Sequence, residues 1–342
     1  MTSPRRRLLL SGSVLGVLAL LAVAAPAYFT ADDSAAAAPG QNPVTVCVVA
    51  HRDANSEHGR TLTVSQRVAD LLVRQSSSYY GPCAVYGAAR PLGQGTVRTF
   101  AQLQGNRPTS VGITFSPKTL TGLPSEMTDG LRCFDVNGDG VRQEMLECAG
   151  GHERPLELPA ALTRLSDVPF KWALVNWNPH GHGPPGIYEH SHFDFHFYTQ
   201  PKAERDAIRL GPCGVVVHCD DFATGTAPVP AQYLPAGYSD NAAVEALMGN
   251  HLVDMTDEEW NGSPFVKTFI YGAYAGKITF LEPMITKGWF DRLSSGQQAG
   301  GCFPINQPAA WQEPGWYPKV YCTEFRPNRD EYVVTLQDFS HS

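Results

Sequence analysis

The clearest pattern of hydrophobic and polar positions runs from Glu189 to Tyr198, where the two kinds of residue alternate. A period of two is the period of a β-strand, so a strand is predicted here. One face carries three phenylalanines, and the other carries His190, His192, Asp194, His196 and Tyr198. The phenylalanine face can pack on a core. The imidazole face needs polar partners, and one metal ion can serve several imidazoles at once.

The rest of the pattern predicts short strands, few helices and many turns. We expect strands at 44–50, 93–103 and 109–115, a hairpin of 265–271 with 277–282, strand-like segments at 170–177, 317–325 and 332–336, and helices at 62–74, 203–210 and 241–248. The predicted class is mainly β (or α+β). We expect an antiparallel, barrel-like domain with a few short helices and a small disulfide-stapled N-terminal segment.

The N-terminus has the pattern of a secretory signal peptide. Three arginines precede an apolar run over 8–23, and Ala25-Pro26-Ala27 offers a cleavage site, so removal of residues 1–27 is predicted. General and twin-arginine export both fit. The apolar run is shorter than the roughly 20 residues of a membrane span, so no stable span is expected after cleavage. Residues 28–43 are predicted to be a linker, 44–84 a small cysteine-bounded module, and 85–342 a β-rich domain with an insertion at 130–152.

Cysteine content and charge narrow the class of protein. Eight cysteines in an exported chain favour disulfides over a zinc cluster. Roughly a hundred pairings are open to eight cysteines, and pairing of sequence neighbours is the simplest. It gives Cys47–Cys83, Cys133–Cys148, Cys213–Cys219 and Cys302–Cys322. A net charge of −7 without a basic block argues against nucleic acid as a partner. An exported, disulfide-bonded protein is therefore predicted.

A metal site is the main chemical hypothesis. The candidate ligands of one transition-metal ion (Zn, Fe, Mn, Ni or Cu) are His192, His196, His251 and Glu282, with His182 as a fifth. Glu282 shares a predicted strand face with Ile278 and Phe280, and an inward carboxylate needs a cation or a proton.

Spacing is the difficulty for a single ion. On a straight strand, four residues span about 13 Å, which is too far for His192 and His196 to bind one ion. A bulge, strong curvature or only one of the two as ligand is required. Asp194 is expected to orient an imidazole, with Tyr198 beside it. The alternative is a metal-free hydrogen-bond network. His180 and His190 are expected at the surface.

A second candidate site is a calcium-like loop in the insertion. Asp135, Asn137 and Asp139 occupy positions 1, 3 and 5 of an EF-hand-type loop, and a glycine follows at position 6. Position 12 is leucine instead of glutamate, so Gln143, Glu144 and Glu147 are the remaining oxygen donors. Structural calcium is one interpretation of this composition, and an Asp/Asn/Gly turn without metal is the other.

Six short motifs occur in a fixed order: Gly-Gln-Gly-Thr-Val-Arg-Thr-Phe (93–100), Trp-Asn-Pro-His-Gly-His (177–182), His-Phe-Asp-Phe-His-Phe-Tyr (192–198), Met-Gly-Asn-His (248–251), Phe-Ile-Tyr-Gly (269–272) and Glu-Pro-Met (282–284). Over roughly 85–340, the chain resembles an uncharacterised family of secreted bacterial proteins with a domain of unknown function. The resemblance implies a β-rich, barrel-like domain and export, and no established reaction. The chain departs from it at His190, Ser191 and the insertion near 135.

A weaker resemblance covers residues 44–84. Thr-Leu-Thr-Val-Ser (61–65) and Gly-Pro-Cys (81–83) are similar to a small cysteine-bounded module of exported bacterial proteins. The histidines of that module are replaced here by Val48 and residues 72–75, so a stapled surface appendage is the interpretation.

The functional prediction is a secreted metal-binding protein that acts as a metal-dependent enzyme on an unknown small molecule. Metal-assisted hydrolysis and oxygen or redox chemistry both stay open. The alternative is a non-catalytic envelope or ligand-binding barrel with structural histidines. A homo-oligomer is open in either case.

Overall fold

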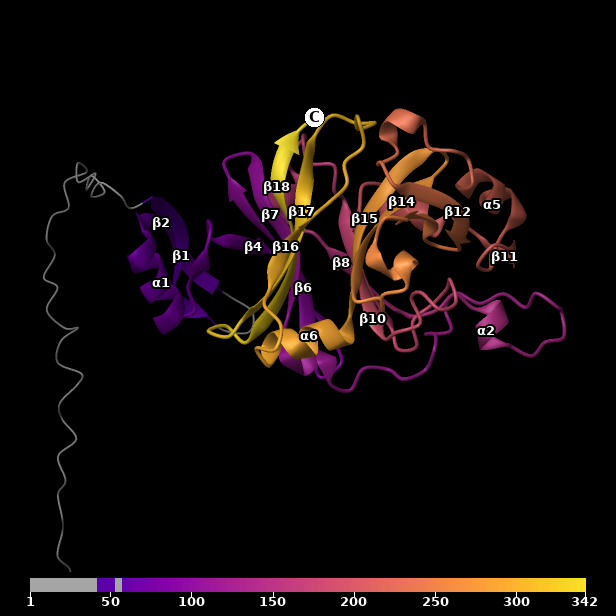
Figure 1. Cartoon of the computed structure of the whole chain (residues 1–342), viewed down its shortest axis with the longest axis horizontal. Coiled ribbons are helices and arrows are strands. Elements are labelled where there is room, and N and C mark those ends of the chain that lie inside the picture. The colour runs from indigo at the N-terminus through magenta and orange to yellow at the C-terminus, as the bar shows by residue number, and fades with distance from the viewer. Residues whose placement is uncertain (1–41, 53–56) are drawn as a thin grey trace, which may run out of the picture. The chain divides into compact units, whose positions relative to one another are not determined.

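The computed structural model describes residues 42–52 and 57–342 (Figure 1). The predicted signal peptide, and the predicted linker up to residue 41, lie outside the described residues. Among the described residues, strands of antiparallel sheets dominate and helices are short. The predicted mainly β class is therefore confirmed. The described part of the chain contains no helix with both the length and the apolar character needed to cross a membrane.

The N-terminal segment forms a small three-stranded sheet with one helix. Its strands are β1 (Pro43–Arg52), β2 (Glu57–Ser65) and β3 (Tyr79–Tyr80), and its helix is α1 (Gln66–Gln75). The predicted helix over 62–74 was wrong at its start. Leu62 lies opposite Val46 in the β1–β2 ladder. Thr61-Leu-Thr-Val-Ser65 is rich in β-branched residues, which favour a strand, so the helix begins only at Gln66.

The first large sheet has seven strands: six follow the order β16-β17-β18-β7-β6-β4, and the seventh, β5, pairs with β6. The strands are β4 (Ala84–Tyr86), β5 (Arg90–Leu92), β6 (Gly95–Gln104), β7 (Arg107–Phe115), β16 (Gly301–Pro304), β17 (Trp316–Arg326) and β18 (Glu331–His341). The predicted strands near 93–103 and 109–115 and the closing segments fall in this sheet.

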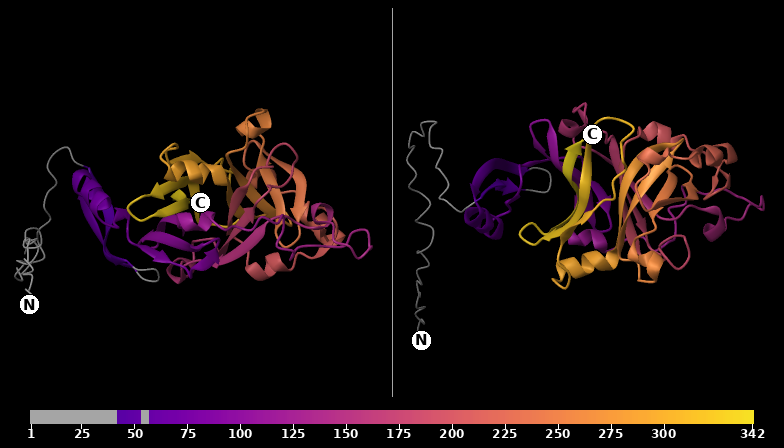
Figure 2. Two further views of the ribbon diagram at one scale, coloured as in Figure 1. Left: turned by 90° about the horizontal axis from the view of Figure 1, so that it is seen from below. Right: turned by 45° about the horizontal axis from the view of Figure 1, so that its top comes forward.

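The second large sheet has seven strands in the order β12-β13-β14-β15-β10-β9-β8. The strands are β8 (His152–Glu157), β9 (Trp172–Asn178), β10 (His192–Tyr198), β12 (Tyr238–Glu245), β13 (Gly249–Asp254), β14 (Lys267–Tyr274) and β15 (Lys277–Thr286). The histidine-rich strand β10 thus lies inside a sheet, between β9 and β15 (Figures 1 and 2).

Short elements connect these strands. They are η1 (Pro117–Leu120), α2 (Glu144–Glu147), α3 (Ala160–Thr163), α4 (Lys202–Asp206), β11 (Leu210–Cys213), α5 (Cys219–Gly225), η2 (Ala231–Tyr233), η3 (Glu258–Asn261) and α6 (Lys287–Ser294). The predicted helix at 203–210 is shorter than expected, because Leu210 already belongs to β11.

The predicted helix at 241–248 was wrong. This segment lies mainly in β12, where Val244 pairs with Asn250 of β13. The ladder shifts register between Asp240 and Ala243, and Ala242 has a positive φ of 54°. The extra residues of such a bulge disturb the strand alternation. The apolar positions of the segment therefore fall at a spacing that looks helical in the sequence.

The main core lies between the two large sheets. Phe193, Phe195 and Phe197 of β10 are buried there with apolar residues of β6, β7 and β18. Phe195 and Phe115 stack with ring centroids 6.0 Å apart. Phe290 of α6 closes the same cluster and meets Phe115 edge-on. The predicted apolar face of the histidine strand is confirmed.

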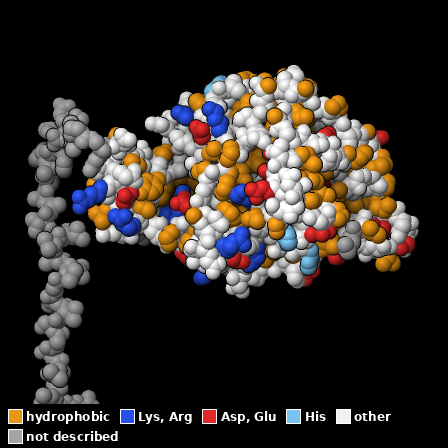
Figure 3. Space-filling view, in the orientation of Figure 1, with side chains coloured by type: hydrophobic (Ala, Val, Ile, Leu, Met, Phe, Trp, Pro, Cys, Tyr) orange, Lys and Arg blue, Asp and Glu red, His pale blue; other side chains and the backbone are white. Residues whose placement is uncertain are grey.

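Four disulfides join the described cysteines in the predicted sequential order. They are Cys47–Cys83, Cys133–Cys148, Cys213–Cys219 and Cys302–Cys322. Disulfides persist in oxidising compartments, so they indicate an extracellular setting. On the face seen in Figure 3, basic and acidic side chains lie in small mixed groups, and histidines reach the surface beside acidic residues.

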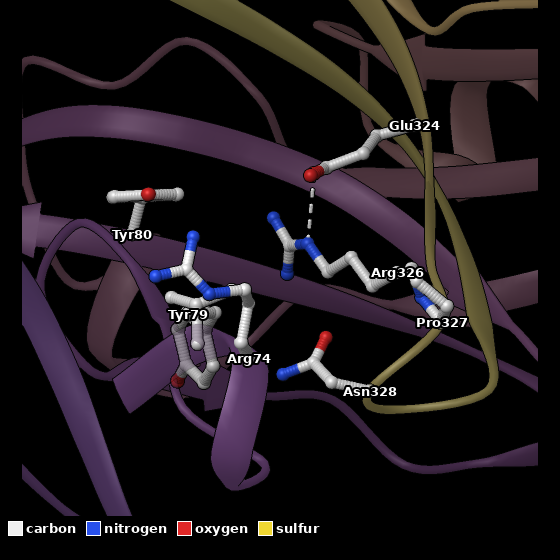
Figure 4. A pocket seen from close by; sticks show the side chains of 8 residues that line it. Arg74, Tyr79, Tyr80, Glu324, Arg326, Pro327 and Asn328 are labelled. Atoms are coloured by element: carbon white, nitrogen blue, oxygen red, sulfur yellow. Dashed lines mark hydrogen bonds and ion pairs between the residues drawn. The ribbon is translucent and has the colours of Figure 1, made fainter. Parts of the chain in front are cut away.

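The N-terminal segment contacts the turn between β17 and β18 (Figure 4). Asn328 donates hydrogen bonds to the carbonyls of Ser76 and Ser78, both at 2.8 Å. Arg326 in turn donates to Glu324 at 2.8 Å. A pocket of about 330 Å³ lies at this contact, lined by Val73, Arg74, Tyr79, Tyr80, Glu324, Arg326, Pro327 and Asn328. These hydrogen bonds tie the cysteine-bounded segment to the larger sheets.

Candidate metal centres

Strand β10 presents its polar side chains to a second, smaller core on the side of the sheet opposite the phenylalanines. Its pairing with β9 is regular from His192 to Tyr198, without a bulge. His192, Asp194 and His196 therefore point to one side, and each is at most 2 % exposed. Apolar residues of β9, β13, β14 and β15 make up the rest of this smaller core.

The predicted ligands fall into two groups instead of one. His182, His192 and Asp194 form the first group, which we call the loop centre. His196, His251 and Glu282 form the second, which we call the strand centre. Within each group the ligand atoms lie within 4.8 Å of one another. The reason for the split is the regular strand: without a bulge, His192 and His196 are too far apart for one ion. Asp194 accordingly belongs to a ligand group, where a supporting role was expected.

The two imidazoles of the loop centre are held in one tautomer. Nδ1–H of His192 donates to the carbonyl of His190 at 2.6 Å, and Nδ1–H of His182 donates to that of Gly183 at 2.8 Å. In a neutral imidazole, the other nitrogen then carries a lone pair. Both Nε2 atoms face Asp194, at 3.1 Å for His192 and 3.8 Å for His182. A backbone carbonyl on the far nitrogen is the usual support of a metal-binding histidine.

Two asparagines support the loop centre and were missed in the sequence. Asn178 donates to Oδ2 of Asp194 at 2.6 Å, and the amide of Asn176 lies 3.5 Å from the same oxygen. In the β9–β10 ladder they lie directly opposite His192 and Asp194. The sequence did contain a signal for them: Asn176 and Asn178 are two residues apart, as are His192 and Asp194. Two such pairs on neighbouring strands can lie side by side on one face of the sheet.

The pKa of Asp194 lies well below its ordinary value. Burial alone would raise it, but the adjacent imidazoles of His192 and His182 outweigh burial and favour the carboxylate. The loop centre therefore holds an ionised carboxylate. Its Oδ1 atom is buried without a hydrogen-bond partner.

The strand centre is assembled from three strands of one sheet. Nε2 of His196 on β10 lies 3.4 Å from Oε1 of Glu282 on β15. The side chains of His196 and Glu282 are 0 % and 1 % exposed. Among the described residues, neither ring nitrogen of His196 has a hydrogen-bond partner, and neither has Oε2 of Glu282. On β13, Nδ1–H of His251 donates to the carbonyl of Ala243 at 3.0 Å, which leaves Nε2 as its ligand atom.

Gly272 lets His251 approach Glu282 across the intervening strand β14. His251 pairs with Gly272, and Gly272 pairs with Phe280 of β15. A Cβ at Gly272 would lie 2.1 Å from the Phe280 ring, so only glycine fits under that ring. The Phe280 ring then packs against His251, with centroids 5.3 Å apart. The last residue of Phe-Ile-Tyr-Gly thus shapes the wall of the strand centre.

A bulge separates Ile278 from the strand face shared by Phe280 and Glu282. The β14–β15 ladder shifts register beside Gly272, so that Phe280 and Ile278 pair with adjacent residues. Ile278 packs against the main core, whereas Phe280 lies in the smaller core. The expected common face of Ile278, Phe280 and Glu282 was therefore wrong for Ile278. The inward direction of Glu282 is confirmed by its burial.

Burial controls the charges of the strand centre. It lowers the pKa of His196 well below the ordinary value and also lowers that of His251, so both imidazoles are neutral. It raises the pKa of Glu282 well above the ordinary value, and the negative charges of Asp194 and Glu245 add to this. Neutral imidazoles are the form that binds metal. An ionised Glu282 requires a cation beside it.

The other predicted residues lie around these centres. Tyr198 is buried beside the strand centre, with its ring 5.7 Å from that of His196, and stacks on Trp172 at 4.1 Å. His180 and His190 are exposed, as expected.

The carboxylates of the calcium-like loop accept hydrogen bonds from the backbone of the loop. Asp135 accepts backbone N–H groups of Gly138 and Gly140, and Asp139 accepts from Val141. Glu147, which is 2 % exposed, accepts from three backbone N–H groups within the loop. The remaining candidates, Asn137, Gln143 and Glu144, lie in or beside the same exposed loop. Calcium at this loop stays a prediction.

Comparison of the chain with family models, with curated proteins and with solved structures gives no match. The two centres therefore rest on the chemistry of their own residues. Each offers two imidazoles and one carboxylate, a set that binds zinc in hydrolases and iron in oxygenases.

Proposed function

We propose that the chain is an exported metal-binding protein and that the strand centre, formed by His196, His251 and Glu282, holds a transition-metal ion. One observation carries the proposal. A fully buried imidazole lies beside a buried carboxylate, and His196 has no hydrogen-bond partner for either ring nitrogen. Leaving such groups unpaired is costly. A metal ion bound by His196 and Glu282 removes that cost.

The donor set supports a metal-dependent enzyme. Three protein ligands leave at least one coordination position for water or substrate, whereas structural zinc sites are closed by four. Bound zinc would supply an activated water for hydrolysis, and bound iron would supply oxygen chemistry. The neutral imidazoles and the single carboxylate suit Zn, Fe, Mn, Ni and Cu, so the identity of the metal decides the reaction class.

The ordered motifs support membership of the uncharacterised secreted family. Trp-Asn-Pro-His-Gly-His, His-Phe-Asp-Phe-His-Phe-Tyr, Met-Gly-Asn-His and Glu-Pro-Met supply all six residues of the two centres. Four disulfides fit the export that this membership implies.

Elemental analysis of untagged protein tests the strand centre. His196→Ala and Glu282→Ala each remove one ligand, so we expect each to lose one equivalent of metal per chain. His180→Ala is the matched control, because His180 is exposed and its Nε2–H donates to the carbonyl of Ser125 at 2.9 Å. Circular dichroism verifies that each variant is folded. Equal metal content in wild type, His196→Ala and Glu282→Ala would refute the proposal and favour a metal-free histidine network.

A further inference from the structure

We infer that the loop centre, formed by His182, His192 and Asp194, binds a second metal ion, and that this ion keeps an exchangeable position where a small anionic ligand coordinates. The loop centre shares no residue with the strand centre. Either proposal can therefore fail without the other.

The first argument is that atoms with lone pairs lie close together at the loop centre. Nε2 of His192 and Oδ1 of Asp194 lie 3.1 Å apart. In the neutral form of His192, with the proton on Nδ1, both atoms are acceptors, and the Asp194 carboxylate is 3 % exposed. Nε2 of His182, an acceptor when that ring is neutral, lies 3.8 Å from Oδ2 of the same carboxylate. Acceptors converge in this way around a cation.

The second argument is that the site is already oriented. The His192 ring is fixed by the His190 carbonyl, the His182 ring by the Gly183 carbonyl, and Asp194 by the Asn178 amide. Every ligand thus has an outer hydrogen bond, as metal ligands in proteins usually do. The backbone also holds the loop, because His182 N–H donates to the Tyr188 carbonyl at 3.2 Å.

Gly181 brings His182 to this position. Its φ is +72°, and a Cβ there would lie 2.1 Å from the Tyr188 carbonyl oxygen. Only glycine therefore allows the loop after β9 to fold back so closely. The returned loop places the His182 ring 4.7 Å from the His192 ring.

The third argument concerns access. The His182 side chain is 34 % exposed, whereas His196 and Glu282 of the strand centre are enclosed. Three protein ligands leave a coordination position free, and at the loop centre solvent reaches that position past His182. A cation bound to one carboxylate retains positive charge, so a carboxylate, phosphate or similar small anion is the expected ligand class.

Cobalt(II) with azide tests both parts of the inference. Metal-free protein is loaded with cobalt(II), the bound equivalents are counted, and azide is added while the visible spectrum is recorded. We expect two equivalents and an azide-dependent spectral change. His182→Ala should weaken binding of one equivalent by at least about 100-fold, the upper range for loss of an outer partner, and abolish the azide response.

Matched variants separate the two centres. His196→Ala should lose the other equivalent and keep the azide response, while His180→Ala, in the same loop, should retain both equivalents. Asp194→Asn is a second variant of the loop centre and should behave like His182→Ala. The equivalent retained at the strand centre shows that a loop-centre variant is folded. If wild type binds one equivalent of cobalt(II), and His182→Ala and Asp194→Asn still bind it, there is no second metal site at the loop centre. An azide response that is absent from His196→Ala, which keeps the loop centre, overturns the exchangeable position.

Discussion

At the scale of single residues, hydrogen bonds of the backbone decide which atoms are available for chemistry. His182, His192 and His251 each donate from Nδ1 to a backbone carbonyl, so that Nε2 is the remaining nitrogen in all three. Nε2 of His192 lies 3.1 Å from Asp194 and 3.4 Å from the Asn178 amide. His196 is different, because neither of its nitrogens has a partner. The pattern is simplest if every Nε2 serves one purpose, which is metal binding.

Asn178→Ala should weaken metal binding at the loop centre. The Asn178 amide donates to Oδ2 of Asp194 at 2.6 Å and orients that carboxylate. Loss of such a partner costs about 10- to 100-fold in metal affinity, measurable by competition with a chelator. Asn176→Ala is the comparison and should cost less, because its amide lies farther from the same oxygen, at 3.5 Å. Equal losses in both variants would contradict the assigned role of Asn178.

Glu282→Gln should separate metal binding from folding. The amide keeps the shape of the side chain but cannot be a negatively charged ligand. Metal at 100 times its dissociation constant stabilises a binding protein by about 2.7 kcal/mol, and the variant should lose this gain at the strand centre. Without metal, the variant should unfold at a temperature no lower than wild type, because a buried charge is costly. Thermal unfolding with and without metal measures both effects, and a metal-dependent gain in the variant would argue against Glu282 as a ligand.

At the scale of elements, strand pairing determines which predicted ligands meet. Alternation in 189–198 correctly predicted the polar and apolar faces of β10, and the candidate ligands named from the sequence fall in or beside the two centres. Their division into two groups depends on neighbours across the sheet, such as Asn178 opposite His192. The bulge at the β14–β15 ladder and the positive φ at Ala242 likewise leave no clear local signal. The sequence pattern therefore predicted the positions of strands better than the directions of their side chains. It predicted least well which side chains meet in one centre.

The calcium-like insertion yields a prediction of its own. Glu147 accepts backbone N–H groups of Val136, Asn137 and Gln143, at 3.0, 3.4 and 2.9 Å. A hydrogen bond to a charged group contributes about 1.5–3 kcal/mol. Because Glu147→Ala removes three of them, the variant should lower the free energy of unfolding by about 2 kcal/mol or more. Glu144→Ala is the control, since its ion pair with Arg142 is largely exposed and worth little.

Denaturant unfolding, repeated with calcium, measures this change. If calcium stabilises wild type and Glu147→Ala equally, Glu147 supports the loop without binding the ion. No change in stability on Glu147→Ala would contradict the role given to its hydrogen bonds.

At the scale of the molecule, the two centres share a sheet with a buried ion-pair network that joins distant segments. Arg132 lies just before the calcium-like loop, Glu153 lies on β8 and Arg205 on α4, and both arginines pair with Glu153. Arg132 also pairs with Glu245 of β12, at the far edge of the same sheet. The network thus connects the two ends of the strand order that holds the metal ligands.

Lowering the pH should reduce the stability that this ion-pair network contributes. Burial tends to raise the pKa of Glu153, but Arg132 and Arg205 outweigh burial and lower it. A carboxyl group with a lowered folded-state pKa stabilises the fold above its unfolded pKa, near 4.3. That stability is lost as the pH falls through the folded-state pKa. Glu153→Gln should therefore lower the unfolding temperature most at neutral pH, and its difference from wild type should shrink as the pH falls below about 4. Glu157→Gln, exposed on the same strand, should track wild type throughout. A difference between Glu153→Gln and wild type that is constant from neutral to acidic pH would show that Glu153 does not act through its charge.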